Sequence, residues 1–578
     1  MSVNCPHAER CGGCPLIHLD YHAGLAEKQE RARRAFSRYP SLALEPRAVR
    51  PAPTVVDYRV RAKFVVGPGA QVGLYAAASH EVVDIPECRV LTPTVRAVVA
   101  ALRSRAAEPS PADAAVFDAL VAIDAREVSD GGAPRALLTL VLDAAREVPE
   151  RALAAAAAAL MSAAPELAGV SVSRRARDAV QLLGAGHRLV RGVGRAPDRI
   201  GEVTHLAVPG AFVQAHRAQA AALHAALVAA LERALGGLAG KRGVELYAGS
   251  GAIGLALAHA GMTMTLVESY PEAAAAARDA ARELPSGAVE VITGDAGRVA
   301  RALARDRVRP DVVVVDPPRR GLEPAARVAL AALEPRALAY VSCNPETLAR
   351  DLSHLVELGY RAAPPEPFDM IPLTEELECL AVLTRGAPPP LRVLHADDQW
   401  LVVDKPPHED PRHLLQRVRR VVGFAEARAA VSLHTEASGA LPFTHSTAPS
   451  AVRVRFVAAV RGVTRPSGSV NRPLGGAPAR TRYRRLGVAH GHSLLEILAE
   501  PGSPEQLRRH LAGLGHPVLG DTRFGHGPTN RHVAERHGLD RLFLHASRVE
   551  LDPGGHGNEI VVSCALPGDL AVFAEASG

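Results

Sequence analysis

GVELYAGSGAIGLALA, residues 243–258, predicts the fold of the central part of the chain. An apolar strand runs into Gly249, Gly251 and Gly254, and an apolar helix follows. Glycines let the backbone approach a bound nucleotide closely, and the N-terminus of a helix supplies free N–H groups. The glycines alone are equally typical of a tight strand-to-helix turn without a ligand. The segments downstream must therefore decide whether this turn binds a nucleotide.

Three carboxylates follow at the ends of predicted strands. LVESY places Glu268 where a carboxylate can accept both ribose hydroxyls, and ITGDA offers Asp295 near an adenine. DVVVVDPPRRGLEP is a buried strand that ends at Asp316, because proline cannot continue a central strand. Glu268 or Asp295 taken singly is more typical of a solvated loop carboxylate. Their spacing behind the glycine turn favours a cofactor site at the carboxyl edge of a doubly wound sheet.

Cys343 and Glu378 stand at the ends of two further predicted strands. Cys343 ends the strand in ALAYVSCNPETLARDL, and Glu378 begins one in FDMIPLTEELECLAVLTR. A free cysteine is most often a buried structural residue, and a single glutamate is most often a surface charge. A thiol at a strand end beside proline-containing loops is more typical of a reactive site. We therefore expect Cys343 to lie near the cofactor.

The segments DPPRRGL, YVSCNP and D-M-x-P-x-T-x-x-x-E resemble the bacterial uracil-C5 methyltransferases of ribosomal and transfer RNA, over roughly residues 5 to 385. The resemblance implies a class I, Rossmann-like fold that binds S-adenosylmethionine, with Cys343 as nucleophile and Glu378 as base. AFVQAH corresponds to a Phe-Phe-Gln motif of that family. The predicted cofactor-binding residues are Gln214, Tyr247, Gly249, Gly251, Glu268, Asp295 and Asp316.

This sequence departs from the family pattern at several positions. Glu245 replaces the usual aspartate before the glycine turn. The family commonly has asparagine, asparagine, histidine and histidine where this chain has His216, Asp279, Leu373 and Glu376. We expect these departures to affect how the substrate is positioned more than they affect the reaction itself.

The chemistry explains why a thiol and a carboxylate are needed together. Carbon 5 of uracil is too poor a nucleophile to attack a methyl sulfonium, so a thiolate must first add to carbon 6. After methyl transfer, a carboxylate must remove the proton from carbon 5 before the thiol can leave. The base cannot be reached within a helical stack, so we expect a flipped or single-stranded uridine.

Four of the seven cysteines form a separate group near the N-terminus. Cys5, Cys11 and Cys14 follow the pattern C-x5-C-x2-C, and Cys88 lies in DIPECRV. Four thiolates suit zinc or an iron-sulfur cluster equally. The methyltransferase resemblance implies a 4Fe-4S cluster with a structural or RNA-positioning role, since methyl transfer needs no redox step. The cysteine pattern begins at residue 5, and we expect no RNA-binding barrel of the kind that the family frequently has before it. In this respect the chain resembles the branch acting on uridine 747 of 23S rRNA.

The sequence from Leu391 resembles a second family, the large-subunit-type pseudouridine synthases. LRVLHADDQWLVVDKPPHED carries Lys405 and Pro406 of their Lys-Pro motif, and ARTRYRRLG, HPVLGDTRFG and RLFLHASRVEL match later segments. His434 occupies the position of the catalytic aspartate, and Glu436 starts from the wrong backbone position to replace it. Ser438 and Gly439 align with the family, whereas EPGSPEQLRRH retains only part of a further motif, namely Gly502, Gln506 and Arg508.

The altered motifs predict an inactive RNA-binding appendage. Candidate phosphate contacts are Arg482, Arg484, Arg485, Arg508 and Arg509, although each alone is more typical of a solvated surface charge.

Length and composition set the domain plan. A chain of 578 residues exceeds one hydrophobic core, and we expect a Cys-cluster region at 1–90, an α/β RNA-binding domain at 91–205, a methyltransferase domain at 206–386 and an α+β synthase-like domain at 391–578. The chain shows no secretion signal and no apolar run of membrane-spanning length, so we expect a cytoplasmic protein without a membrane partner. The net charge of +6 is compatible with RNA, and no protein partner is implied.

Three functions remain open. We favour a single-activity methyltransferase that forms 5-methyluridine in RNA, with 23S rRNA ahead of tRNA as substrate. The alternatives are a bifunctional methyltransferase and pseudouridine synthase, and an inactive RNA-binding or ribosome-assembly factor. The sequence keeps Cys343, Glu378 and Asp316 but has no aspartate at position 434. This combination favours the single-activity methyltransferase over the two alternatives.

Overall fold

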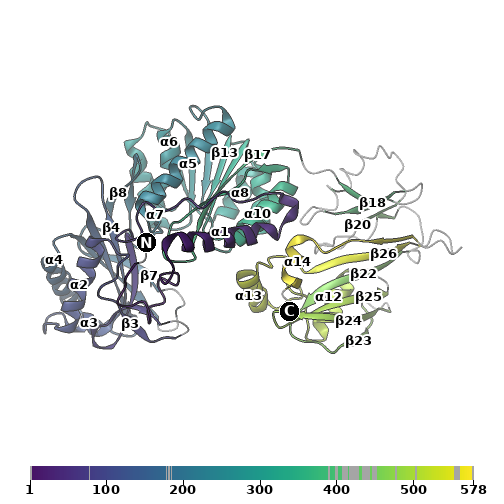
Figure 1. Ribbon diagram of the computed structural model, residues 1–578, viewed down its shortest axis with the longest axis horizontal. Coiled ribbons are helices and arrows are strands. Elements are labelled where there is room, and N and C mark those ends of the chain that lie inside the picture. Colours follow the sequence, from purple (N-terminus) through teal and green to yellow (C-terminus); the bar gives the residue numbers. More distant parts are fainter. Residues whose placement is uncertain are drawn as a thin grey trace.

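The computed structural model describes residues 3–76, 79–176, 179, 182–183, 185–387, 391–396, 401–405, 414, 429–432, 443–444, 452–474, 478–500, 504–551 and 560–575. Three bodies follow one another along the chain, an N-terminal sheet, a central α/β domain and a C-terminal domain (Figure 1). Within these ranges, no helix combines the length and apolar character that a membrane crossing requires.

The central domain is built on one eight-stranded sheet. Its main path runs β12 (Val289–Thr293), β11 (Thr263–Glu268), β10 (Arg242–Leu246), β13 (Val312–Val315), β14 (Ala337–Ser342), β17 (Glu378–Arg385) and β15 (Tyr360–Ala362), and β16 (Glu366–Phe368) pairs with β17. The strands from β12 to β14 are parallel, and β17 is antiparallel to β14. The predicted α/β class is confirmed.

Both faces of this sheet are buried, which explains the unbroken valine run of β13. Val313 and Val315 pack into one hydrophobic cluster with α8 (Ala296–Arg305), α9 (Pro324–Ala332) and α10 (Pro345–Glu357). Val312 and Val314 pack into the opposite cluster with α5 (Arg217–Leu235) and α6 (Ala252–His259). Successive side chains of a strand point to opposite faces, so a strand covered on both sides is apolar throughout. β10 lies between β11 and β13, the switch point where such sheets bind ligands.

Helix α1 (Tyr21–Ser37) belongs to the central domain, although it lies within the predicted Cys-cluster region. Its Ala32, Ala35 and Phe36 join the same hydrophobic cluster as α10. Buried Lys28 donates to the Asp369 carboxylate at 2.5 Å and to the carbonyls of residues 371 and 376. Helix α1 therefore stabilises the loop that leads to Glu378.

The N-terminal sheet also crosses a predicted boundary. Its order is β3 (Val82–Asp84), β2 (Val72–Tyr75), β1 (Arg61–Val66), β4 (Leu120–Val128), β5 (Arg135–Asp143), β6 (Leu167–Arg175) and β7 (Ala185–Gly192). β1 pairs with β4, so segments on both sides of residue 90 share one sheet. The helices α2 (Pro93–Ala107), α3 (Ala114–Ala119) and α4 (Glu150–Ala163) pack with it in a single core (Figure 1). The sequence pattern predicts where these strands lie but not which strands pair with each other.

The C-terminal domain contains a six-stranded sheet in the order β23 (Ser467–Asn471), β24 (Arg480–Ala489), β25 (His492–Glu500), β22 (Val452–Val460), β26 (Leu544–Leu551) and β27 (Ile560–Ser563). Its helices are α12 (Pro504–Gly513), α13 (Gly527–His537) and α14 (Gly568–Glu575). Arg508 forms a buried ion pair with Asp521 at 2.6 Å, so it is a structural residue here. Pro406, His434, Glu436, Ser438, Gly439 and Gly502 lie outside the described residues, and the predicted loss of synthase activity stays a prediction.

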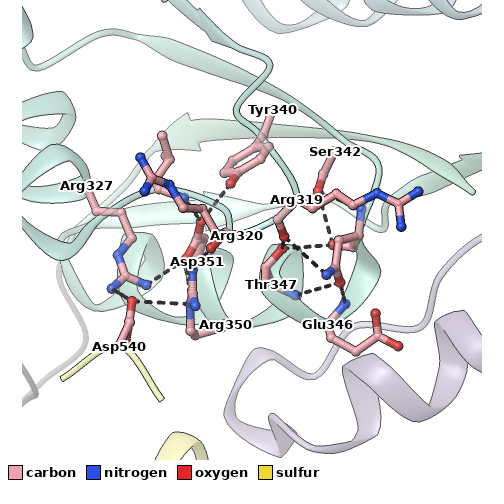
Figure 2. Close-up of polar contacts among 12 residues, drawn as sticks. Arg319, Arg320, Arg327, Tyr340, Ser342, Glu346, Thr347, Arg350, Asp351 and Asp540 are labelled. Carbon is pink, nitrogen blue, oxygen red and sulfur yellow. Dashed lines mark hydrogen bonds and ion pairs between the residues drawn. The ribbon is translucent and has the colours of Figure 1, made fainter. Parts of the chain in front are cut away.

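A buried ionic network joins the C-terminal domain to the central one (Figure 2). Arg327 of α9, only 1% exposed, contacts Asp351 at 2.7 Å and Asp540 at 2.8 Å. Arg350 of α10 contacts Asp351 at 2.8 Å and Asp540 at 3.5 Å. The Tyr340 hydroxyl donates to Asp351 at 2.6 Å. Because unpaired buried charges are costly, these contacts define one arrangement of the two domains.

Candidate active site

A cavity of about 500 Å³ opens at the carboxyl edge of the central sheet. Loops after β10, β11, β13 and β14 meet there with the first residue of β17. The lining includes seven residues predicted from the sequence, namely Gln214, Tyr247, Gly249, Glu268, Asp316, Cys343 and Glu378. The fold thus brings the predicted cofactor residues and the predicted catalytic pair to one place.

The glycine turn and Glu268 form one wall of this cavity. Tyr247, Gly249 and Gly251 have φ angles of 63°, 57° and 85°, in the left-handed region that glycine tolerates best. One Glu268 carboxylate oxygen accepts the Gly249 N–H at 2.8 Å, and the other accepts the Tyr270 N–H at 2.7 Å. Each carboxylate oxygen has two lone pairs, so Glu268 can shape the turn and still accept hydroxyl groups.

Glu245 lies beneath the turn, at the position where the resembling family has aspartate. Its carboxylate accepts the N–H of Gly254 at 2.8 Å, and burial raises its pKa to about 8. A Cβ atom at position 254 would lie 2.4 Å from this carboxylate and 2.1 Å from Leu266, so only glycine fits there. The Glu245 side chain therefore links the first turn of α6 to β10 through a hydrogen bond.

Cys343 and Glu378 meet because β14 and β17 are antiparallel neighbours. Ser342 pairs with Cys379, which places Cys343 and Glu378 next to each other at the end of the ladder. Both side chains line the cavity. Cys343 is half-buried, whereas Glu378 is only 4% exposed. A nucleophile and a base thus share one end of the site.

Burial shifts the proton affinities of this group upward. Burial first, and then the charge of Glu378, raise the pKa of the Cys343 thiol to about 12, while Arg319 opposes the shift. Burial and nearby Asp316 raise the pKa of Glu378 well above its usual value. Burial raises the pKa of Asp316 to about 7. The site without substrate therefore holds protons at neutral pH and can accept or release them during a reaction.

Arg319 is a site residue to which the sequence reasoning assigned no role. It lines the cavity, and its guanidinium pairs with Glu376 at 2.7 Å. Its carbonyl accepts hydrogen bonds from Asn344 at 3.2 Å and Thr347 at 3.1 Å (Figure 2). The signal was its position directly after Asp-Pro-Pro, where the loop must turn back toward the site.

Two predicted cofactor residues do not line the cavity. Gly251 caps the N-terminus of α6, and the Asp295 carboxylate caps α8 by accepting the N–H of Arg298 at 2.7 Å. Burial first, and then the charge of Asp295, raise the pKa of Tyr247 to about 12, so Asp295 lies near that end of the site. A role for Asp295 in binding the cofactor stays a prediction.

The four N-terminal cysteines line a second cavity, of about 180 Å³. Burial, and then Cys88 and Cys11, raise the pKa of the Cys14 thiol to about 12. Burial also raises the pKa values of Cys11 and Cys88. In the described part of the chain, no three His, Cys, Asp or Glu side chains are arranged to hold a metal ion. The fold brings the four thiols to one cavity, and the 4Fe-4S cluster stays a prediction.

Comparison with known proteins agrees with the geometry of the central domain. Residues 207–386 match the family described as tRNA (Uracil-5-)-methyltransferase. An uncharacterized RNA methyltransferase of Caldanaerobacter subterraneus subsp. tengcongensis is 30% identical over 399 residues, covering 66% of this chain and 84% of the relative. One from Gloeobacter violaceus is 32% identical over 391 residues, covering 66% and 82%.

A solved structure supports the fold. The Pyrococcus abyssi tRNA (uracil-54, C5)-methyltransferase, in complex with S-adenosyl-L-homocysteine, is 24% identical with a TM-score of 0.51. The alignment covers 65% of this chain and 86% of that one.

Proposed function

Because the chain belongs to the tRNA (uracil-5-)-methyltransferase family, whose members are RNA-modifying enzymes, we propose that it methylates carbon 5 of a uridine in RNA. One observation carries this proposal. Cys343 and Glu378 adjoin at the end of β14 and β17, in the same cavity as the glycine turn and Glu268. A nucleophile, a base and a nucleotide-binding turn are the groups that methylation of a poor carbon nucleophile needs.

The proposed cofactor is S-adenosylmethionine, which supplies an electrophilic methyl group when it is bound. The glycine turn offers backbone N–H groups, and Glu268 keeps lone pairs for ribose hydroxyls. Gln214 and Asp316 line the same cavity as this turn and Cys343. The S-adenosyl-L-homocysteine complex of the Pyrococcus abyssi protein supports the same class of ligand.

In the proposed mechanism, the Cys343 sulfur first forms a bond to carbon 6 of uracil. The thiol gives up its proton, and the electron pair of the C5–C6 double bond moves toward carbon 5 and the C4 carbonyl. Asp316 lines the same cavity and is proposed to take that proton, and the Arg319 cation favours the thiolate. Carbon 5 would then capture the methyl group as the bond between that group and the sulfonium sulfur breaks, with S-adenosylhomocysteine as the leaving group. The Glu378 carboxylate removes the remaining proton from carbon 5, the C5–C6 double bond re-forms, and the sulfur leaves with its electron pair.

The proposed substrate is RNA with a flipped or single-stranded uridine, and 23S rRNA ranks ahead of tRNA. The flipped conformation is required because carbon 6 must be approached from the face of the ring, which is stacked in a helix. The order of the two RNAs follows the family resemblance of the N-terminal cysteine pattern.

Incubation with methyl-labelled S-adenosylmethionine and unmodified transcripts of 23S rRNA and tRNA tests this function. We expect label in one of these RNAs, and nucleoside digestion should place it in 5-methyluridine. Label in a different nucleoside would contradict the proposed reaction. Failure of both transcripts to accept label would contradict the proposed enzyme.

We also propose that Cys5, Cys11, Cys14 and Cys88 hold a 4Fe-4S cluster. Anaerobically purified protein should show broad visible absorbance and about four iron atoms per chain. Cys14→Ser should lose both, because the cluster would lack a ligand, whereas Cys564→Ser in the C-terminal domain should keep both. Stoichiometric zinc without iron would identify the site as a zinc site instead.

A further inference from the structure

A polar crevice of about 440 Å³ lies between the central and C-terminal domains. Arg38, Asn344 and Arg350 line it on the side of α1 and α10, and His490, Arg536 and His537 line it on the side of α13. In Figure 1, α13 and α14 are the parts of the C-terminal domain that face α1. The crevice exists only because the two domains are docked.

The ionic network described above holds the two walls of this crevice at a fixed distance. Asp540 follows α13 by three residues, and it contacts Arg327 at 2.8 Å and Arg350 at 3.5 Å. Arg350 both lines the crevice and belongs to this network. The wall that carries Arg536 is therefore placed by a buried contact close to it in the chain.

The crevice carries more positive charge than its carboxylates compensate. Glu346 in the lining is paired with Arg31 at 3.0 Å. The exposed guanidinium groups of Arg38 and Arg536 have no carboxylate partner among the residues that the structure describes. A nearby anion would therefore find two available guanidinium groups, one on each wall.

Two imidazole rings lie beside Arg536 on the same wall of the crevice. The rings of His490 and His537 are stacked, with centroids 3.7 Å apart and an interplanar angle of 26°. Burial first, and then the neighbouring His490, His532, His492 and Arg536, lower the pKa of His537 to about 4. Both rings are therefore neutral near pH 7, and the positive charge of the crevice comes from its arginines.

The crevice adjoins the candidate active site along the chain. Cys343 lines the catalytic cavity, and the next residue, Asn344, lines the crevice. The Asn344 side chain is fixed, because it donates to the carbonyl of Arg319 and caps α10. Adjacent Cα atoms are about 3.8 Å apart, so the crevice and the catalytic cavity come close to each other at these two residues.

We propose that the crevice binds backbone phosphates of the RNA segment flanking the target uridine, with the C-terminal domain forming one wall of the RNA groove. This inference rests on the proposed function. Arginine guanidinium groups contact phosphate oxygens without reading sequence, which would fix the register of the RNA while the catalytic cavity selects the base. Arg38 and Arg536 are positioning residues in this scheme.

Charge reversal on each wall tests the proposal. Arg38→Glu and Arg536→Glu should each raise the dissociation constant and the KM for RNA about tenfold, and each should lower the salt dependence of binding by about one released cation. The value of kcat at saturating RNA should not change, because neither residue touches the reacting atoms. Arg233→Glu changes an exposed residue of α5, which packs on the opposite face of the sheet from α10. It is the matched control and should bind like the unaltered chain.

Binding is measured with the 23S rRNA and tRNA transcripts whether or not they accept methyl groups. Arg38→Gln and Arg536→Gln should show smaller losses of affinity, and all variants should unfold at the temperature of the unaltered protein. If the reversals bind RNA as tightly as Arg233→Glu, the proposal is overturned in favour of an acidic protein surface as occupant. Absent methyl transfer by the unaltered protein would instead count against the proposed function.

Discussion

Cys343→Ala is expected to reduce methyl transfer to RNA by about four orders of magnitude or more, because no other group can activate carbon 5 of the uracil ring. Among the residues lining the catalytic cavity, Cys343 is the only thiol. Cys343→Ser should be nearly as inactive, since a hydroxyl is a far weaker nucleophile than a thiolate. Initial rates with labelled S-adenosylmethionine provide the measurement.

A covalent trap separates loss of the nucleophile from loss of RNA binding. RNA that carries 5-fluorouridine should form a stable adduct with the unaltered protein, because fluorine cannot be removed from carbon 5 as a proton can. Cys343→Ala should bind this RNA without forming the adduct. Cys564→Ala removes a buried thiol in the C-terminal domain and should react normally. Methylation that persists in Cys343→Ala would refute the assignment of the nucleophile.

Glu378→Gln is expected to lower turnover about a thousandfold and to accumulate a covalent protein–RNA adduct with ordinary uridine. Glutamine keeps the size of the side chain but cannot accept the proton from carbon 5. Cys343 can then add and the methyl group can transfer, but the sulfur cannot leave. Denaturing gels with labelled RNA detect the adduct, and Glu366→Gln on neighbouring β16 is the control. Loss of activity without an adduct would place Glu378 before methyl transfer rather than after it.

The unaltered enzyme should also become faster as pH rises above neutrality. The raised pKa values of Cys343 and Glu378 mean that both groups hold protons at low pH. The reactive thiolate and carboxylate forms become more populated as pH rises, so the rate should increase in that direction. Glu378→Gln should change this profile, whereas a purely structural role for Glu378 would leave it unchanged.

Local sequence patterns were sufficient to predict the α/β class and the edge of the sheet that carries the site. The valine run of β13 requires cover on both faces, and the glycines and prolines after β10 and β13 mark where these strands end. Cys343 and Glu378 were proposed as partners by resemblance, since 35 positions separate them in the sequence. Their proximity depends on an antiparallel pairing that no local pattern contains.

Features that depend on packing between distant segments could not be predicted. Helix α1 shows the periodicity of a helix, but nothing in residues 21–37 indicates that Lys28 reaches Asp369. Arg319 belongs to the DPPRRGL motif, but its place in the cavity depends on a turn that hydrogen bonds from Asn344 and Thr347 stabilise. The domain boundary at residue 90 followed the cysteines, whereas the sheet follows the pairing of β1 with β4.

Through Asp540, the C-terminal domain stabilises the loop beside Cys343. Asp351, which shares both arginines with Asp540, also accepts the N–H of Leu322, and Arg350 donates to the carbonyl of Arg320 (Figure 2). A single carboxylate from the last third of the chain thus helps to keep the segment after Asp-Pro-Pro in its working shape. Removal of this domain would therefore disturb the loop even if the domain performs no chemistry of its own.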